Sequence, residues 1–133
     1  MNQIENQKGY TTIIFVLLMP IILMFSGIIL DGSMIMYNQN KLMVAVKYAT
    51  LSATTEYDIQ SGKVRIDVDS ARNKAEQVLM QNSKDAEIAE FLVENGNECH
   101  LVANLEMEYT FMKLFGFNKK ILHAEYYAVR NKT

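Results

Sequence analysis

A charge-free run near the N-terminus constrains this chain more than any other feature. Residues Tyr10–Leu30 read YTTIIFVLLMPIILMFSGIIL and contain no Asp, Glu, Lys or Arg. As a helix, this run would measure about 31 Å, close to the ~30 Å hydrocarbon core of a bilayer. Pro20 would break a soluble helix but is tolerated in a membrane-spanning one. The run therefore predicts one transmembrane helix over residues 10–30, with the lipid bilayer as its partner.

Three fates are open to such a segment. A cleaved secretory signal has a shorter apolar core and small residues at the cut site, and here the only small pair near the end is Ser26-Gly27. An uncleaved signal anchor fits the length of the run. The third fate is a prepilin-type leader, a short polar stretch that ends in a basic residue and a glycine directly before the apolar run. Residues 1–9, MNQIENQKG, have this form. The candidate residues for cleavage by a prepilin peptidase are Lys8, Gly9 and Tyr10.

The charges that flank the run predict its orientation. Lys8 and the terminal amine precede it, whereas Asp31 follows it directly. Basic residues stay on the cytoplasmic side of a membrane segment. We therefore expect a single-pass protein of the cell membrane, with a cytoplasmic N-terminus and an extracytoplasmic C-terminal domain. Lys41 and Lys47 follow the run as well, and a helix that continues beyond the membrane would accommodate them.

Beyond Asp31 the apolar residues become periodic, recurring at steps of seven, four, three and four, which indicates one helical stripe. The stripe consists of Ile35, Leu42, Val46, Ala49 and Ala53. No proline occurs between residues 21 and 57, so we expect one helix from Tyr10 to Tyr57, about 70 Å long, whose part over residues 31–57 is amphipathic. Small residues such as Ala45 allow another element to approach closely. Two interpretations stay open: packing on the chain's own globular part, and packing between subunits.

The remaining residues, 58–133, predict an α+β head. Ser61-Gly62 indicates a turn. A second helical stripe then runs from Val68 to Leu79 and ends at Asn82-Ser83. Either of two acids, Asp67 or Asp69, suits its N-cap.

Three strands are expected after the second helix. Residues 86–94 enter the sheet, and Asn95-Gly96 is a hairpin signal. Apolar and polar residues then alternate from Cys99 to Phe111, which is typical of a strand with one buried face. A short helical turn over residues 112–115 leads to a last strand over residues 121–129. The predicted fold class is thus α+β: a long N-terminal helix, a second helix and a three-stranded antiparallel meander.

No sequence pattern predicts chemistry. The nucleotide-binding, protease and hydrolase motifs with a known mechanism are absent, so we expect no enzyme and no cofactor. Cys99 is the single cysteine, which excludes an intrachain disulfide; we expect a buried structural thiol, with an interchain disulfide as the alternative. His100 and His123 lack a clear third ligand, so we expect solvated or hydrogen-bonded strand histidines rather than a metal site. The net charge of −2 and the mixed basic end predict no nucleic-acid partner.

Asp31, at the end of the charge-free run, is expected to be either solvated at the lipid headgroups or paired with a neighbouring subunit.

Two parts of the chain resemble the TadE/TadG-like pseudopilins of the Tad (Flp-type) pilus-assembly family. KGYTTIIFVLLMP and GIILDGSMIMYNQNKLMVAVKYATLSA are similar to the family's N-terminal region: a glycine-ended leader, an apolar segment with a proline, an aspartate near its end and an alanine-rich helix. FMKLFGFNKKILHAEYYAV resembles the end of the family. The matching N-terminal positions are Gly9, Phe15, Pro20, Gly27, Asp31, Leu42, Ala45, Ala49, Leu51 and Ala53.

The resemblance implies a pilin-like fold and a role as a minor pilin-like structural subunit of a Tad or type IV-like pilus or secretion apparatus. Its implied partners are other pilin-like subunits and the pilus-assembly machinery. The implied assembly-interface residues are Ile14, Pro20, Asp31, Ala45, Ala49 and Ala53. One departure is Ile14, which stands where the family usually has a glutamate thought to pair with a neighbour's first amine; its absence resembles the TadG-like branch. The alternative function is an uncleaved, membrane-tethered binding module with an extracytoplasmic α+β domain.

Overall fold

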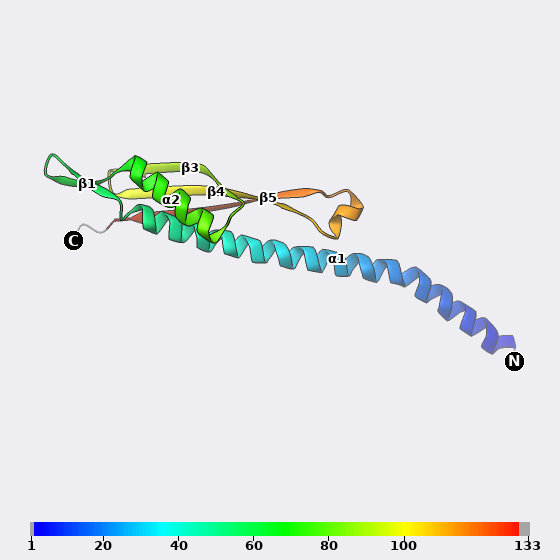
Figure 1. The fold of residues 1–133 in the computed structure, drawn as a ribbon. Coiled ribbons are helices and arrows are strands. Elements are labelled where there is room, and N and C mark those ends of the chain that lie inside the picture. Colours follow the sequence, from blue (N-terminus) through cyan, green and yellow to red (C-terminus); the bar gives the residue numbers. More distant parts are fainter. Residues whose placement is uncertain (1, 131–133) are drawn as a thin grey trace. The chain divides into compact units, whose positions relative to one another are not determined.

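The computed structural model describes residues 2–130, and the side chains of residues 7–130. The first residue of the expected leader and the last three of the expected head lie outside this range. Figure 1 shows the fold, and the described chain divides into two compact units. One contains the residues up to Met34 together with Tyr109–Asn118, and the other contains Ile35–Glu108 together with the chain from Lys119 onward. The long helix α1 contributes to both units.

Helix α1 spans Asn2–Ala53, and both predicted ends were wrong. It begins before Tyr10 because residues 2–8, NQIENQK, contain no helix-breaking residue and several good helix formers. It ends before Tyr57 because two threonine hydroxyls bond to backbone carbonyls just behind them, at Leu51 (2.7 Å) and Ser52 (2.6 Å). Such local bonds compete with the continuation of a helix. The helix continues through Pro20 without interruption.

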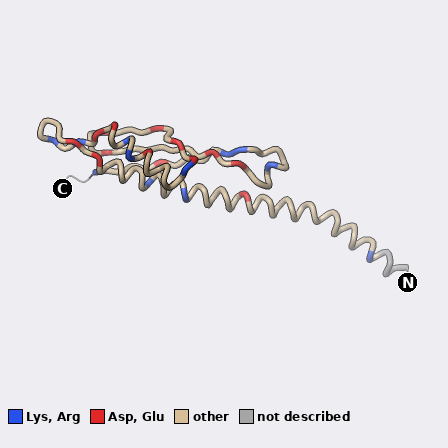
Figure 2. The backbone as a smooth tube through the Cα atoms, in the orientation of Figure 1, with Lys and Arg blue, Asp and Glu red and all other residues tan. Residues whose placement is uncertain are grey.

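Of the described residues, one helix is long and apolar enough to cross a membrane, and it is α1. Its most apolar window has a mean hydropathy of 2.9, and only 6% of that window is buried within the chain. Figure 2 shows that charged residues are nearly absent from the first half of α1 and frequent in the rest of the chain. The Ser and Thr hydroxyls of residues 10–33 all donate to the carbonyl four residues earlier, at 2.8–2.9 Å. Every side-chain hydroxyl of these serines and threonines is thereby satisfied within the helix, as a hydrocarbon environment requires.

A short hairpin follows α1, and sequence reasoning recognised only its turn. Strands β1 (Tyr57–Gln60) and β2 (Lys63–Ile66) pair antiparallel. Ser61 and Gly62 both have positive φ, as the tight turn of a two-residue hairpin requires. The strands are short and mostly exposed, so they carry no alternating pattern that would reveal them. Ile66, which is buried, anchors the hairpin through a 2.8 Å bond from its N–H to the carbonyl of Gly96.

Helix α2 spans Val68–Asn82 and buries Ala71, Ala75 and Leu79, the core of the predicted stripe. Asp67, the first of the two proposed caps, occupies the N-cap position with extended backbone geometry, but its side chain makes no capping hydrogen bond. Its carboxylate accepts a 3.0 Å bond from the Ser70 hydroxyl. The helix ends at Asn82, as predicted.

The predicted three-stranded meander is confirmed, with strand order β3-β4-β5. Strand β3 is Ala86–Glu94, β4 is Glu98–Glu108 and β5 is Lys119–Val129. The turn at Asn95-Gly96 has positive φ at both residues, as its sequence predicts. Strand β4 ends at Glu108 rather than at Phe111, because the next backbone N–H groups bond elsewhere, as described below. The predicted helical turn is a 3₁₀ helix, η1, over Met112–Phe115.

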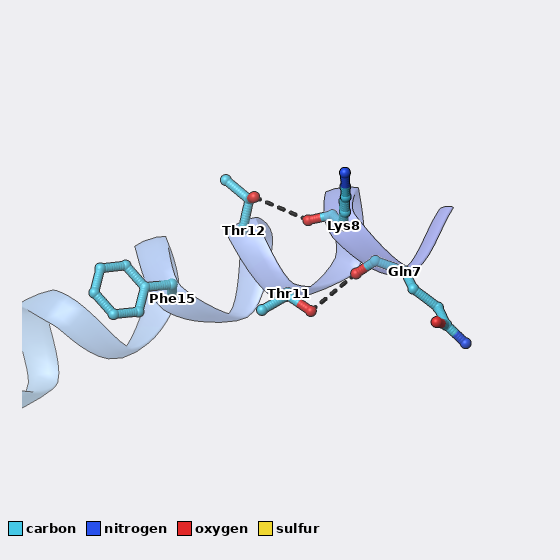
Figure 3. Close-up of a pocket in the computed structure, with 5 residues that line it drawn as sticks. All are labelled: Gln7, Lys8, Thr11, Thr12 and Phe15. Atoms are coloured by element: carbon cyan, nitrogen blue, oxygen red, sulfur yellow. Dashed lines mark hydrogen bonds between the residues drawn. The ribbon is translucent and has the colours of Figure 1, made fainter. Parts of the chain in front are cut away.

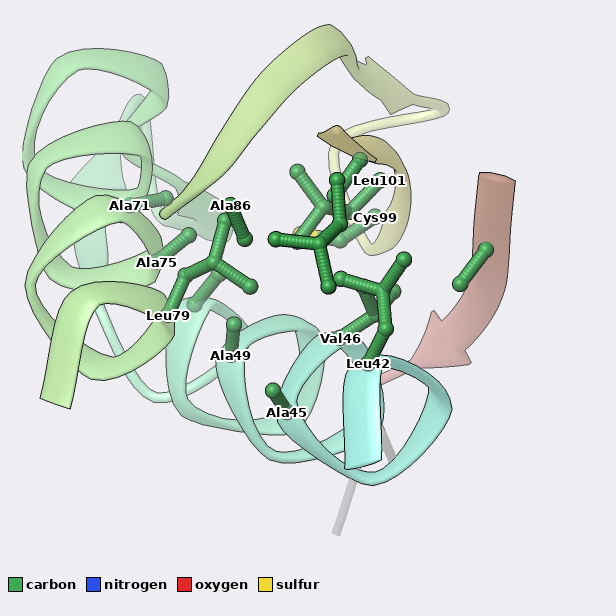
Figure 4. Close-up of a cluster of buried hydrophobic side chains, with 14 of the residues drawn as sticks. Leu42, Ala45, Val46, Ala49, Ala71, Ala75, Leu79, Ala86, Cys99 and Leu101 are labelled. Carbon is green, nitrogen blue, oxygen red and sulfur yellow. The ribbon is translucent and has the colours of Figure 1, made fainter. Parts of the chain in front are cut away.

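The core lies between α1, α2 and the inner face of the meander, within the second unit (Figure 4). Leu42, Val46 and Ala49 contribute from α1, Leu79 from α2, and Leu101 from β4. All but Leu79 are fully buried, and Leu79 nearly so. The predicted stripe of α1 therefore packs on the chain's own globular part, which confirms the first of its two interpretations.

Candidate functional site

The carboxylate of Asp31 binds a loop that is distant in sequence. Asp31 accepts hydrogen bonds from three consecutive backbone N–H groups: Thr110 (3.1 Å), Phe111 (3.0 Å to one oxygen, 3.2 Å to the other) and Met112 (2.6 Å). Only 3% of Asp31 is exposed. Sequence reasoning considered headgroup solvation and pairing with another subunit for this acid; the structure gives it partners within the same chain.

The loop presents these N–H groups because residues 109–118 leave the β4–β5 ladder, and we call them the 109–118 loop. Its fourth to seventh residues form η1, and the first N–H groups of any helical turn have no partner within the turn. A carboxylate is the strongest acceptor for such groups. Gly116, with φ 92°, ends the turn, and the Tyr109 N–H donates to the Asn118 carbonyl at 3.1 Å to close the loop.

Gly27 makes a second attachment, one helical turn before Asp31 and on the same side of α1. A Cβ at this position would lie 3.0 Å from the Cβ of Phe111, so only glycine allows this close approach without a shift. Gly32, in contrast, has nothing within 4 Å of such a Cβ. Gly27 is itself buried although it belongs to the charge-free run. The 109–118 loop is thus fixed to α1 by a carboxylate and by a backbone-to-ring contact.

The three candidate cleavage residues, Lys8, Gly9 and Tyr10, are exposed on α1. A shallow hollow on the helix surface surrounds this point; Gln7, Lys8, Thr11, Thr12 and Phe15 line it (Figure 3). The hydroxyls of Thr11 and Thr12 donate to the carbonyls of Gln7 and Lys8, both at 2.9 Å. These hydroxyls are therefore engaged by the helix itself, and the peptide between Gly9 and Tyr10 is helical.

The structure does not bring the six implied assembly residues together. Ile14 and Pro20 are exposed on the apolar half of α1, and Asp31 is covered by the 109–118 loop. The three alanines are fully buried in the chain's own core. These are Ala45, Ala49 and Ala53.

A second apolar stripe, which sequence reasoning missed, lies on the opposite side of α1. Tyr37, Val44, Tyr48 and Leu51 recur at steps of seven, four and three, and we call them the outer stripe. Their exposure ranges from 68% at Tyr37 to 41% at Leu51. At 100° per residue these four side chains lie opposite the buried stripe, with Lys41 among them. The spacing was visible in the sequence, but two apolar stripes on one helix do not reveal which one faces the core.

The two histidines are hydrogen-bonded strand residues, as expected. His100 lies 3.2 Å from a carboxylate oxygen of Glu125 and stacks on Tyr127 with ring centroids 3.9 Å apart. His123 bonds to the side chain of Asn104. Among the described side chains, no group of three or more His, Cys, Asp or Glu comes together in a way that suits a metal ion.

An exposed ion pair joins strands β4 and β5 near the 109–118 loop. Lys119 Nζ lies 2.9 Å from Glu106 Oε1. The hydrogen bond and the charge of Glu106 raise the pKa of Lys119. Both side chains are more than half exposed, so the pair contributes little to stability.

Cys99 is fully buried in the core, as predicted, and burial raises the pKa of its thiol from 9.0 to about 11. A thiol whose folded pKa lies above its unfolded pKa stabilises the fold below the unfolded value and loses that contribution as pH rises through the folded value. We therefore expect thermal stability to fall more steeply between pH 9 and pH 11 in the natural protein than in the Cys99→Ala variant. Melting curves of both proteins over this range check the prediction, and parallel curves would contradict it.

Comparison with protein-family models, with curated proteins and with solved structures finds no match to this chain.

Proposed function

We propose that this chain is a membrane-anchored, minor pilin-like structural subunit of the TadE/TadG-like kind, and that it takes part in assembling a Tad or type IV-like pilus or secretion apparatus. It holds no catalytic site in this proposal and needs no cofactor. The first half of α1 anchors it in the bilayer, with a cytoplasmic N-terminus and an extracytoplasmic head. Its mechanism is assembly: the apolar helix keeps the subunit in the membrane until it packs beside the helices of other pilin-like subunits.

The observation that supports this proposal is the outer stripe. In the outer half of α1, the buried stripe packs against the chain's own core. The opposite side still exposes the two tyrosines, the valine and the leucine of the outer stripe. A helix that only links an anchor to a soluble head has no need of apolar side chains on its solvent side, and contiguous exposed apolar surface marks an interaction site. A neighbouring helix would pack along α1 by contacting the four side chains of the outer stripe.

The three buried alanines that the family resemblance implied therefore have a different role in this proposal. Ala45 and Ala49 hold the head against α1, since their small side chains permit close packing. In this proposal, other subunits contact the outer stripe of α1, which includes Tyr37 and Val44, and not the alanines.

A photo-crosslinking amino acid at Val44 tests the proposal in native membranes. We expect crosslinks to other proteins that have an N-terminal apolar helix, identified by mass spectrometry. The matched control is the same amino acid at Lys63, an exposed residue of the β1–β2 hairpin, which should give no such product. Intact mass of the purified protein tests the leader separately, since a chain that begins at Tyr10 supports processing by a prepilin peptidase.

The membrane-tethered binding module is the outcome if position 44 crosslinks only to lipid or to nothing. The proposal of a pilin-like subunit would then be wrong, whether or not the intact mass shows a chain that begins at Tyr10. Equal crosslinking from positions 44 and 63 would also contradict it, because contact through the head alone does not need the outer stripe.

A further inference from the structure

The 109–118 loop carries an unusual set of exposed apolar side chains. Its sequence is YTFMKLFGFN, which contains three of the six phenylalanines of the chain, no acidic residue and one lysine. Leu114 is 83% exposed, and Phe111, Phe115 and Phe117 are each more than two-fifths exposed. A loop at the surface of a water-soluble domain would normally have polar residues in these places.

Contacts within the loop hold its backbone in the conformation that exposes those side chains. The backbone is closed by the bond between Tyr109 and Asn118, and Tyr109 packs edge-on against Phe117 with ring centroids 6.3 Å apart. The turn of η1 is ended by Gly116, whose N–H donates to the Lys113 carbonyl. The exposed rings therefore sit on an ordered turn rather than on a loose tip.

The attachment of the loop to α1 places it at the end of the charge-free run. Phe111 contacts Gly27, which lies three residues before Leu30, the last residue of that run. At 1.5 Å per residue, the contact is about 5 Å inside the end of the run. Apolar side chains at a membrane surface reach about 5–10 Å into the boundary between headgroups and acyl chains. The loop and the proposed span belong to the same compact unit, so this depth follows from contacts within that unit.

From these observations we infer that the 109–118 loop is a second membrane contact, which inserts Leu114, Phe115 and Phe117 into the bilayer interface beside the helix that crosses it. The occupant of this surface is lipid. The surface is continuous with the proposed span through Gly27 and Phe111, and its combination of Phe and Leu with one Lys and no acid suits the boundary between acyl chains and anionic headgroups.

The inference rests on the membrane anchoring in the proposed function, and not on assembly with other subunits. It also explains why the carboxylate of Asp31 binds backbone N–H groups of the loop. Three N–H groups of the loop would lose their water partners on entering the acyl-chain boundary, and Asp31 supplies acceptors for all of them from the helix itself.

The absence of tryptophan from the chain permits a direct test. Three full-length variants each contain a single tryptophan: Leu114→Trp in the loop, Phe15→Trp in the proposed span and Ile59→Trp in the β1–β2 hairpin. Each is reconstituted into vesicles of phosphatidylcholine and phosphatidylglycerol, with and without lipids brominated near the top of the acyl chains. We expect the emission of L114W to shift to shorter wavelength and to be largely lost on bromination, whereas I59W keeps its emission.

The three variants separate the possible failures. Loss of emission from F15W together with full emission from L114W would overturn the loop inference and leave the membrane span standing. Full emission from F15W as well would overturn the proposed anchoring itself. A shift of L114W to shorter wavelength that depends on protein density, without quenching by brominated lipid, would mean that a second protein covers the loop, and the inference of a lipid occupant would then be wrong.

Discussion

Replacing Asp31 by alanine is expected to release the 109–118 loop from helix α1. The substitution removes the acceptor of the bonds that the N–H groups of Thr110, Phe111 and Met112 make to the helix. Each bond to a charged acceptor is strong enough that its loss should raise local amide exchange on the order of tenfold or more. Hydrogen exchange followed by mass spectrometry, on the full chain in lipid nanodiscs, measures the effect in peptides that cover these residues.

The matched control for Asp31 is Asp85→Ala. Asp85 is an exposed acid in the turn before β3, so its removal should leave exchange in the loop unchanged. The Asp31→Asn variant keeps one oxygen acceptor without the charge, and we expect it to fall between the natural protein and the alanine variant. Unchanged exchange at Thr110–Met112 in the alanine variant would show that Asp31 does not hold the loop.

The second large effect is expected at Leu101 in the core. Its side chain is fully buried among residues of α1, α2 and the sheet. Truncation to alanine removes buried apolar surface and leaves a cavity that the close-packed surroundings fill only in part, which costs about 2–5 kcal/mol. Urea unfolding of the head in detergent micelles, followed by circular dichroism, measures the loss.

Ile59→Ala is the control for the Leu101 variant, since the same number of carbon atoms is removed from a hairpin side chain that is 66% exposed. Its free energy of unfolding in micelles should change by no more than about 0.5 kcal/mol. Similar losses for both variants would mean that the core does not lie where α1, α2 and the meander meet.

The elements of the fold were largely predictable from the sequence where a periodic pattern had one explanation. Strand β4 alternates because one face is buried and one is wet, and the Asn95-Gly96 turn needs residues that tolerate positive φ. The β1–β2 hairpin was missed because its residues are nearly all exposed, so no burial pattern was imposed on them. The end of α1 depends on threonine hydroxyls that bond to the backbone, which a hydropathy pattern does not register.

The candidate site was less predictable, because its two halves are about eighty residues apart in sequence. An acid at the end of an apolar run indicates a boundary but not its partner. Likewise, the sequence pattern makes Phe111 the last residue of an alternating strand, whereas its close approach to Gly27 and its bonds to Asp31 place it against α1. The outer stripe was hidden for another reason: its period is the same as that of the buried stripe, and periodicity alone does not reveal which face a domain covers.

The long sequence separation between Asp31 and its partners also sets an order of events during synthesis. Met112 follows Asp31 by 81 residues. At translation rates of about 5–20 residues per second, roughly 4–16 s pass between the appearance of the acid and that of its last donor. During this interval the carboxylate lacks the donors of the 109–118 loop, and under the proposed anchoring its charge would keep this point of the helix at the water side of the membrane. Under the same proposal, the bonds from the 109–118 loop would close over a helix that has already taken its position, so the last hairpin to be made would secure the first segment to be inserted.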